Sequence, residues 1–154
     1  PEAVKDGHNL DARERMLIAA SMGAVAFQKG LGMIHSLAHP LSSRHGLHHG
    51  LANAVLLPER VAFLDQAALS QDQSARISRV WSMFEKRQSS ADSLAKHSQK
   101  FIMELGMQPG LAQQGITEAD LDLLADEAFE DPCHQSNMVS VNRDDLLSVY
   151  KAAM

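Results

Sequence analysis

Helix-start signals recur along this sequence, and no stretch of it is convincing as a β-strand. Each signal is a polar residue that can cap a helix and that precedes apolar residues spaced three or four positions apart. These signals lie at Asn9, Ser70, Ser90 or Asp92, Thr117 and Asn142. The composition agrees, because only 5% of the residues are aromatic and the abundant unbranched side chains favour helices over sheets. We therefore predict one domain over residues 1–154 with an all-α fold, a multi-helix bundle.

Glycines at positions 30 and 32 divide the first part of the chain into two predicted helices. The first is expected over residues 10–29. The second is expected over residues 31–39, and it should stop or kink at Pro40, whose ring clashes with a carbonyl one turn back. A polar loop is expected at 42–46. The buried face of the first helix is predicted to consist of Met16, Ala20, Gly23 and Phe27.

A third helix is expected from His48 towards Phe63, with room for a kink at Pro58. Because it is apolar nearly all round, we expect it at the centre of the bundle. The stretch from Gln108 to Gly115 is expected to be a loop. The predicted core positions of the later helices are Ile77, Val80, Trp81, Phe84, Leu94, Phe101, Ile102, Leu105, Leu121, Leu124, Ala128, Phe129, Leu146, Leu147 and Tyr150.

Charge and cysteine content exclude several classes of protein. The net charge is −5 and no Lys/Arg cluster is dense, so we expect no nucleic-acid partner. No apolar run reaches the roughly 18 residues of a membrane span, and no signal-peptide pattern is seen. The single Cys133 cannot form an internal disulfide, which favours a reducing, cytoplasmic location. The chain opens at Pro1 without an initiator Met, so we expect a fragment of a longer protein.

Five of the eight histidines lie between positions 35 and 49. His35 and His39 are four residues apart in an apolar context, so on a helix they project from one face. His49 heads the apolar third helix. Imidazole is a common ligand for divalent iron, zinc and nickel, so the spacing of these residues is compatible with a metal site but does not name the ion. Of the other five histidines, His8, His45, His48 and His97 are expected at the surface.

The histidine segment alone is an incomplete metal site. A catalytic divalent ion takes three or more protein ligands, often with a carboxylate among them. No carboxylate lies within the segment, and no pattern recruits the nearest ones, Asp11, Glu14 and Glu59.

Two stretches of sequence resemble the signature of the iron-containing (group III) alcohol dehydrogenases. Residues 30–41 follow the pattern G-L-G-x-x-H-x-x-x-H-P-L, and residues 49–58 follow H-G-x-x-N-A-x-L-L-P. The similarity continues upstream at 12–16. Downstream, residues 131–137 resemble the family's D-x-C-x-x-x-N-P segment, with Met138 in place of the proline. The resemblance therefore spans essentially the whole chain.

The resemblance implies the dehydroquinate-synthase-like helical C-terminal domain of a metal-dependent, NAD(P)-linked alcohol dehydrogenase. In that family an Asp and three His hold the metal, and the Asp and first His come from a D-x-x-x-H helix that would precede this chain. His35 and His49 are then the remaining ligands, which replaces the pairing of His35 with His39 that spacing suggests. His39 becomes the catalytic residue beside the metal, and Cys133 and Phe27 line the substrate pocket.

The same resemblance implies Fe²⁺ as the metal, with Zn²⁺ or Ni²⁺ as alternatives, and NAD or NADP as the coenzyme. The residues that bind the coenzyme are unknown, because the Gly-rich N-terminal domain is missing from this chain. The implied partners are a small alcohol or aldehyde and that missing domain, and a homodimer is left open. We expect the isolated chain to be inactive.

Other interpretations stay open from the residues alone. The chain could be a stand-alone helical module that binds metal or a partner through the histidine cluster. It could also be a structural bundle with incidental histidines, in which case replacing His35 and His49 would leave the metal content unchanged. Cys133 could be a small buried apolar residue, and Phe27 could pack in the core.

Overall fold

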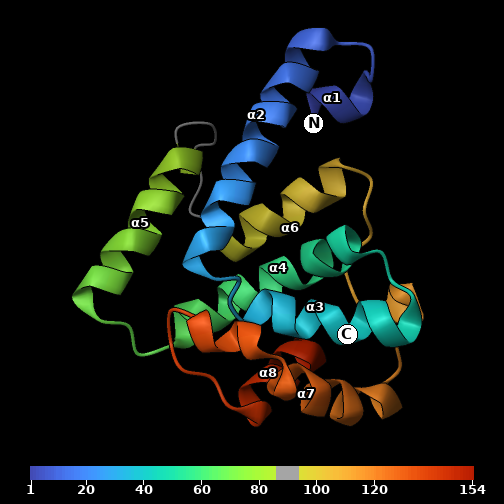
Figure 1. The fold of residues 1–154 in the computed structure, drawn as a ribbon, viewed down its shortest axis with the longest axis vertical. Coiled ribbons are helices and arrows are strands. Elements are labelled where there is room, and N and C mark those ends of the chain that lie inside the picture. The colour runs from blue at the N-terminus through green and yellow to red at the C-terminus, as the bar shows by residue number, and fades with distance from the viewer. Residues whose placement is uncertain (86–93) are drawn as a thin grey trace.

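The computed structural model describes residues 1–85 and 94–154, and within these ranges it contains helices and no strand. The predicted all-α fold is therefore confirmed for the described residues (Figure 1). Short 3₁₀ turns at Phe27–Lys29, Ala112–Gln114, Glu118–Asp120 and Pro132–Ser136 connect some of the helices. The α-helices are α1 (Glu2–Lys5), α2 (Leu10–Ala26), α3 (Met33–His45), α4 (His49–Gln66), α5 (Gln71–Glu85), α6 (Leu94–Glu104), α7 (Leu121–Glu130) and α8 (Arg143–Ala152).

The predicted helix starts at Asn9, Ser70, Thr117 and Asn142 are confirmed as capping interactions. At Ser70 the cap is reciprocal: the Ser70 N–H donates to Gln73 Oε1 at 2.8 Å, and the Gln73 N–H donates to Ser70 Oγ at 3.3 Å. Such a capping box satisfies two backbone donors that the first turn of a helix leaves free. The predicted caps at Ser90 and Asp92 lie outside the described residues, as does the side chain of Phe84.

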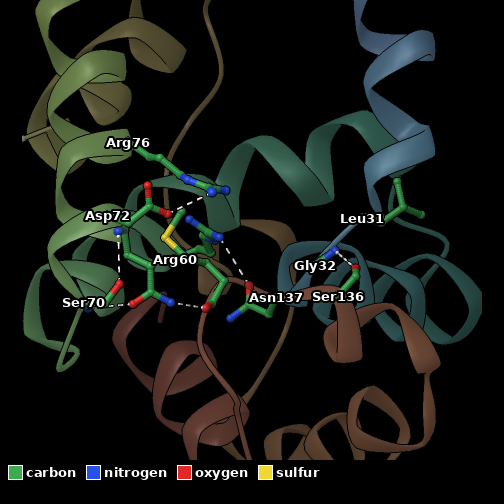
Figure 2. Close-up of a pocket in the computed structure, with 11 residues that line it drawn as sticks. Leu31, Gly32, Arg60, Ser70, Asp72, Arg76, Ser136 and Asn137 are labelled. Carbon is green, nitrogen blue, oxygen red and sulfur yellow. Dashed lines mark hydrogen bonds and ion pairs between the residues drawn. The ribbon is translucent and has the colours of Figure 1, made fainter.

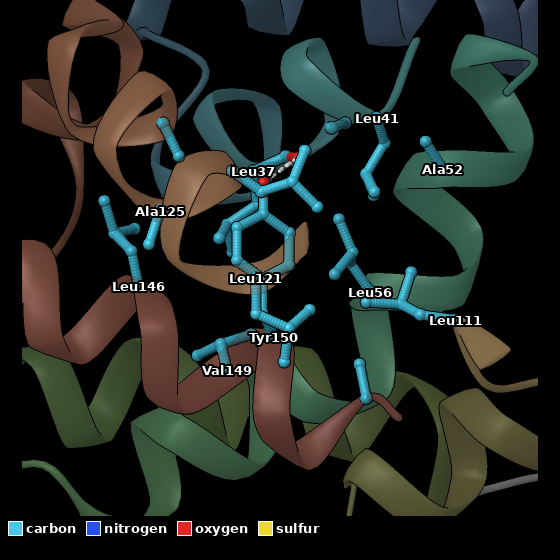
Figure 3. Close-up of a cluster of buried hydrophobic side chains, with 14 of the residues drawn as sticks. Leu37, Leu41, Ala52, Leu56, Leu111, Leu121, Ala125, Leu146, Val149 and Tyr150 are labelled. Atoms are coloured by element: carbon cyan, nitrogen blue, oxygen red, sulfur yellow. Dashed lines mark hydrogen bonds between the residues drawn. The ribbon is translucent and has the colours of Figure 1, made fainter. Parts of the chain in front are cut away.

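The core lies where α3 and α4 meet α7 and α8, with Leu111 and Ile116 added from the connection before α7. Helix α4 is central, as predicted, and packs against α3, α6 and α8. Figure 3 shows the Tyr150 ring in the middle of this cluster, and its hydroxyl donates to the Leu37 carbonyl at 2.5 Å. Burial raises the pKa of Tyr150, so the phenol stays protonated and keeps this donor.

Replacing Tyr150 with Phe is expected to lower the free energy of unfolding by about 1–3 kcal/mol, because the removed hydroxyl is fully buried and leaves the Leu37 carbonyl without this donor. Urea unfolding followed by circular dichroism measures the change. Ser148→Ala on the exposed side of the same helix is the control, and it should change stability by less than about 0.5 kcal/mol. An unchanged midpoint for Tyr150→Phe would show that the hydroxyl contributes nothing.

The predicted helix end at Pro40 is wrong, because α3 continues through Pro40 to His45. Proline removes one helical hydrogen bond, but Pro40 and its neighbours Ala38 and Leu41 are buried in the core, and this packing holds the helix together. The predicted polar loop at 42–46 is mostly the last turn of α3. Gly46 ends it in the left-handed conformation, with φ of 66°.

The predicted burial of the α2 stripe is also wrong. Met16 is 56% exposed and Phe27 is 53% exposed, and Ala12 is the only buried residue of α2. The helix projects from the rest of the molecule (Figure 1), and the short helix α1 packs against it. Its apolar residues therefore form an open surface of Leu10, Met16, Leu17, Ile18, Met22 and Val25.

Three predicted core residues of later helices are exposed instead: Val80, Phe101 and Phe129, at 45%, 41% and 44%. Periodicity predicts one buried face for each helix, but the neighbouring Ile102 and Ala128 take the buried positions of α6 and α7. The Phe129 ring stacks on the His134 ring at a centroid distance of 5.2 Å, so the imidazole covers part of the exposed phenyl ring.

No single helix among the described residues combines the length and apolar composition needed to cross a membrane. The two segments Leu10–Lys29 and Met33–His45 are long and apolar enough to cross a membrane only when taken together, and they are bent by 107° relative to each other.

Candidate metal centre

Three imidazoles converge between α3 and α4. His35 and His39 lie one turn apart on α3, and the packing of α3 on α4 brings His49, the first residue of α4, against both. The ring centroids of His35 and His49 are 5.2 Å apart, those of His39 and His49 are 5.4 Å apart, and those of His35 and His39 are 5.9 Å apart. The structure thus brings together the three histidines that the sequence singled out.

The remaining histidines lie elsewhere. His45 and His48 are exposed, as predicted, and neither contacts these three rings; His45 Nε2 is 4.0 Å from Asp120 Oδ1. His8 is exposed as well. His97 is half-buried and so still partly exposed, and its ring centroid is 6.0 Å from that of Trp81.

The His35 ring is suited to act as a ligand. Burial lowers the pKa of His35, and the neighbouring His49 and His39 lower it further, so the neutral imidazole is favoured. Its Nδ1 atom is buried and has no hydrogen-bond partner among the described residues. A buried ring nitrogen without a partner is costly, and coordination of a cation would supply what the protein does not.

The His49 ring is held by a neighbour on its own helix. The Asn53 side-chain amide donates to His49 Nε2 at 3.1 Å and to the His49 carbonyl at 3.0 Å. This contact orients the ring of the exposed His49 at the start of α4. Partners that orient an imidazole are a usual part of a metal site.

His39 is held by a carboxylate that sequence reasoning missed. His39 Nδ1 lies 2.7 Å from Oδ2 of Asp131, a residue 92 positions later in the chain. The other carboxylate oxygen, Oδ1, accepts from the buried Ser36 hydroxyl at 2.9 Å and from the Cys133 N–H at 2.8 Å. The Ser36 hydroxyl in turn accepts from the His134 N–H at 2.8 Å. Three groups therefore fix the carboxylate.

The charge on Asp131 follows from these contacts. Burial by itself raises the pKa of Asp131, but the hydrogen bonds from His39, from the Cys133 backbone and from Ser36 outweigh it and hold this pKa well below its usual range. The carboxylate is thus ionised at neutral pH and keeps a proton on His39 Nδ1. His39 Nε2 makes no hydrogen bond to the described residues, and the His39 side chain is 41% exposed.

The two predicted pocket residues lie next to these rings. Phe27 is half-exposed with its ring edge-on to His35 at 5.8 Å, so the alternative that it packs in the core is wrong. Cys133 is half-buried beside Asp131. Burial and the neighbouring Asp131 together raise the pKa of the Cys133 thiol to about 11, so at neutral pH this residue is a thiol rather than a thiolate.

The donor atoms of His39, Asp131 and Cys133 lie within 4.8 Å of one another, close enough to be considered as a metal site themselves. The contacts of Asp131 argue against this, because its two carboxylate oxygens already accept three hydrogen bonds. A cation needs deprotonated, available ligands, so we interpret these three residues as a hydrogen-bonded group.

The 131–137 segment also anchors the start of α3. Gly32 precedes α3 and has no side chain to cap it; instead, Ser136 Oγ accepts from the Gly32 N–H at 3.0 Å and Asn137 Oδ1 accepts from the Met33 N–H at 3.4 Å. Gly30, with φ of 96°, lies directly against Ser136. One segment therefore both positions His39 and fixes the helix that carries His35.

Replacing Gly30 with Ala is expected to destabilise the protein by about 2 kcal/mol or more, because the left-handed backbone disfavours a Cβ and the new methyl would overlap the Ser136 side chain. Thermal unfolding measures the effect. Gly7→Ala is the matched control, since no atom lies within 4 Å of the position that its Cβ would take and its φ is not in the left-handed region. Equal melting temperatures for the two variants would contradict the proposed close fit.

The known proteins that this chain is similar to are alcohol dehydrogenases and related enzymes. The model of the Fe-containing alcohol dehydrogenase family, C-terminal, matches residues 1–154. The 4-hydroxybutyrate dehydrogenase of Cupriavidus necator is 36% identical over 159 residues, covering 99% of this chain and 40% of that protein. The NAD-dependent methanol dehydrogenase of Bacillus methanolicus is 33% identical over 162 residues, covering 100% of this chain and 41% of that protein.

Solved structures are similar over the same extent. An alcohol dehydrogenase from Oenococcus oeni superimposes with a TM-score of 0.81 at 27% identity, covering 99% of this chain and 40% of that one. A sulfoacetaldehyde reductase from Bifidobacterium kashiwanohense, solved in complex with NAD⁺, gives 0.77 at 26% identity, covering 99% and 39%. The chain thus spans about 40% of the length of the relatives it matches.

Proposed function

This chain belongs to the Fe-containing alcohol dehydrogenase family, whose C-terminal region it matches from end to end, and from this premise we propose its part in the reaction. The chain supplies two metal ligands, His35 and His49, and the catalytic residue His39 to a metal-dependent, NAD(P)-linked enzyme. That enzyme interconverts alcohols with aldehydes or ketones. The observation that supports the proposal is the convergence of these three rings, with the buried His35 Nδ1 atom, which has no hydrogen-bond partner in the described part of the chain, among them.

The donor set fits a divalent ion of the iron type. Neutral imidazoles suit Fe²⁺, and also Zn²⁺ or Ni²⁺, and the environment of His35 favours its neutral form. When bound, such an ion acts as a Lewis acid that lowers the pKa of an alcohol hydroxyl. Two imidazoles are fewer than the three or more ligands of a catalytic site. We infer that the remaining ligands come from a segment that precedes this chain in the parent enzyme.

His39 serves as the proton carrier. Asp131 holds the Nδ1 proton, so Nε2 is the nitrogen that faces substrate and that takes or returns the hydroxyl proton. A fixed carboxylate also stabilises the imidazolium that forms when Nε2 takes the proton. Phe27 and Cys133 would line the pocket beside it, the first as an apolar wall and the second as a small uncharged one.

The partners of the chain follow from its open surfaces. Leu17, Ile18, Met22 and Val25 of α2 are apolar and more than half exposed, and because contiguous exposed apolar surface marks an interaction site, we expect the rest of the parent enzyme to cover it. That part would also bind NAD or NADP.

The expected substrate is a small alcohol or aldehyde. A homodimer remains a prediction. The single cysteine of the chain favours a cytoplasmic location.

The test is an assay of two proteins side by side: the parent enzyme at its natural length and the 154-residue chain alone. After anaerobic loading with Fe²⁺, the parent enzyme should form NADH or NADPH when given a primary alcohol such as 4-hydroxybutyrate or methanol. The chain alone should show no alcohol-dependent signal, because it contributes two of the ligands and no coenzyme domain. Activity of the chain alone, or an inactive parent enzyme with every alcohol tried, would overturn the proposal.

A further inference from the structure

A cavity of about 500 Å³ lies apart from the histidine cluster. It is bounded by residues 30–32, which precede α3, by Arg60 of α4, by the first turns of α5 and by residues 136–138. None of the three converging histidines lines it. Figure 2 shows the polar side chains that do, with dashed contacts joining Asp72 to Arg76 and Arg60 to Asn137. A cavity of this size is within the range that small molecules occupy.

The lining carries an excess of positive charge. Two guanidinium groups, Arg60 and Arg76, face one carboxylate, Asp72, and that carboxylate is engaged by Arg76 at 2.9 Å. Arg60 and Arg76 also line the smaller cavity beneath, so both side chains lie between α4 and α5. Two like charges sharing one counter-ion repel each other, and an anion between them would remove that repulsion.

Arg60 is the less satisfied of the two. It is half-buried, and the acceptor that the described residues offer to its five N–H donors is the Asn137 side-chain oxygen at 3.3 Å. That oxygen also accepts from the Met33 N–H, so it is shared. Burial lowers the pKa of Arg60, which reflects the cost of a buried charge without a counter-ion.

The rest of the lining suits an organic anion. Ser70 and Gln73 lie at the start of the 15-residue helix α5, where the helix dipole favours negative charge. Leu31 and Met138 add apolar surface that could contact a carbon skeleton. The planar fork of a guanidinium matches the two oxygens of a carboxylate or phosphate.

We propose that this cavity binds a small organic anion whose carboxylate or phosphate oxygens accept hydrogen bonds from Arg60 and Arg76. The site is separate from the one proposed for alcohol oxidation, and it does not depend on a metal ion. The cavity would bind metabolites that carry a carboxylate or phosphate group, whichever alcohol the enzyme oxidises.

Isothermal titration calorimetry of the parent enzyme tests the proposal, with succinate as the carboxylate probe and inorganic phosphate as the phosphate probe, in buffer of matched ionic strength. The variants are Arg60→Gln and Arg76→Gln. Arg79→Gln is the matched control, because Arg79 lies on the same helix, is exposed and does not line the cavity. The Arg76 side chain is 68% exposed, so its replacement leaves the fold intact even if that of Arg60 does not.

At least one probe should bind to the unaltered enzyme and to Arg79→Gln, and Arg60→Gln and Arg76→Gln should each weaken that binding about tenfold or more. The probe that binds tells a carboxylate ligand from a phosphate ligand. Two outcomes overturn the proposal: neither probe binds at concentrations up to about 10 mM, or binding is equal in Arg76→Gln and Arg79→Gln.

Discussion

Replacing His49 with Ala is expected to lower the alcohol dehydrogenase activity of the parent enzyme about 10³-fold or more. The reason is the loss of one of the two imidazoles that this chain supplies to the ion: Lewis-acid stabilisation is worth several kcal/mol, and each 1.36 kcal/mol is tenfold in rate. The same loss is expected for His35→Ala, whose ring centroid lies 5.2 Å from that of His49. Steady-state rates of NAD(P)H formation in the presence of saturating alcohol measure it.

His48→Ala is the matched control for this prediction. His48 is adjacent in sequence and also exposed, and the described residues show no ring contact between it and His35 or His39. Its replacement should leave the rate within about twofold, as is usual for surface substitutions that cost less than ~0.5 kcal/mol. If His48→Ala and His49→Ala lost the same activity, the assignment of His49 as a ligand would be wrong.

Replacing Asp131 with Asn is expected to lower kcat about 10²–10⁴-fold, the range that a positioned general acid–base contributes. An amide cannot hold the Nδ1 proton of His39 as a carboxylate does at 2.7 Å, so the imidazole loses both its fixed tautomer and the charge that stabilises its protonated form. The metal content should be unchanged, because Asp131 is not one of the proposed ligands. Parallel measurement of kcat and bound iron separates these effects.

Glu130→Gln is the control for Asp131→Asn. It removes an exposed carboxylate one residue earlier, at the end of α7, where it makes no contact with the histidines. Its kcat should equal that of the unaltered enzyme. Loss of iron together with activity in Asp131→Asn would instead indicate that Asp131 holds the metal site together.

The parts of the fold that could be predicted from sequence are those set by local chemistry. The caps at Asn9, Ser70, Thr117 and Asn142 are confirmed because a capping side chain and the backbone it satisfies are three residues apart or fewer. The predicted end of α3 is wrong because tertiary packing around Pro40 outweighs its lost hydrogen bond. The exposure of α2 could not be predicted, since burial depends on what covers a helix and not on its own periodicity.

Some residues of the candidate site could likewise be identified from local sequence, and others could not. His35, His39 and His49 could be identified because they lie within one motif, although four-residue spacing points to His35 and His39 as the pair. The resemblance favours His35 with His49, whose centroids are the closer pair, at 5.2 Å against 5.9 Å. Asp131 could not be placed, because no local pattern connects it to a histidine 92 residues earlier. The only signal is its position near Cys133 in the 131–137 segment.

The central claim is that His35 and His49 hold a divalent metal ion, and metal analysis of the anaerobically purified parent enzyme tests it most directly. We expect about one ion per chain in the unaltered enzyme and in His48→Ala, and far less than one in His35→Ala and in His49→Ala, because an ion that loses one of its three or four protein ligands is held much more weakly. Full metal content in both His35→Ala and His49→Ala would contradict the claim and favour a helical bundle in which these histidines are incidental.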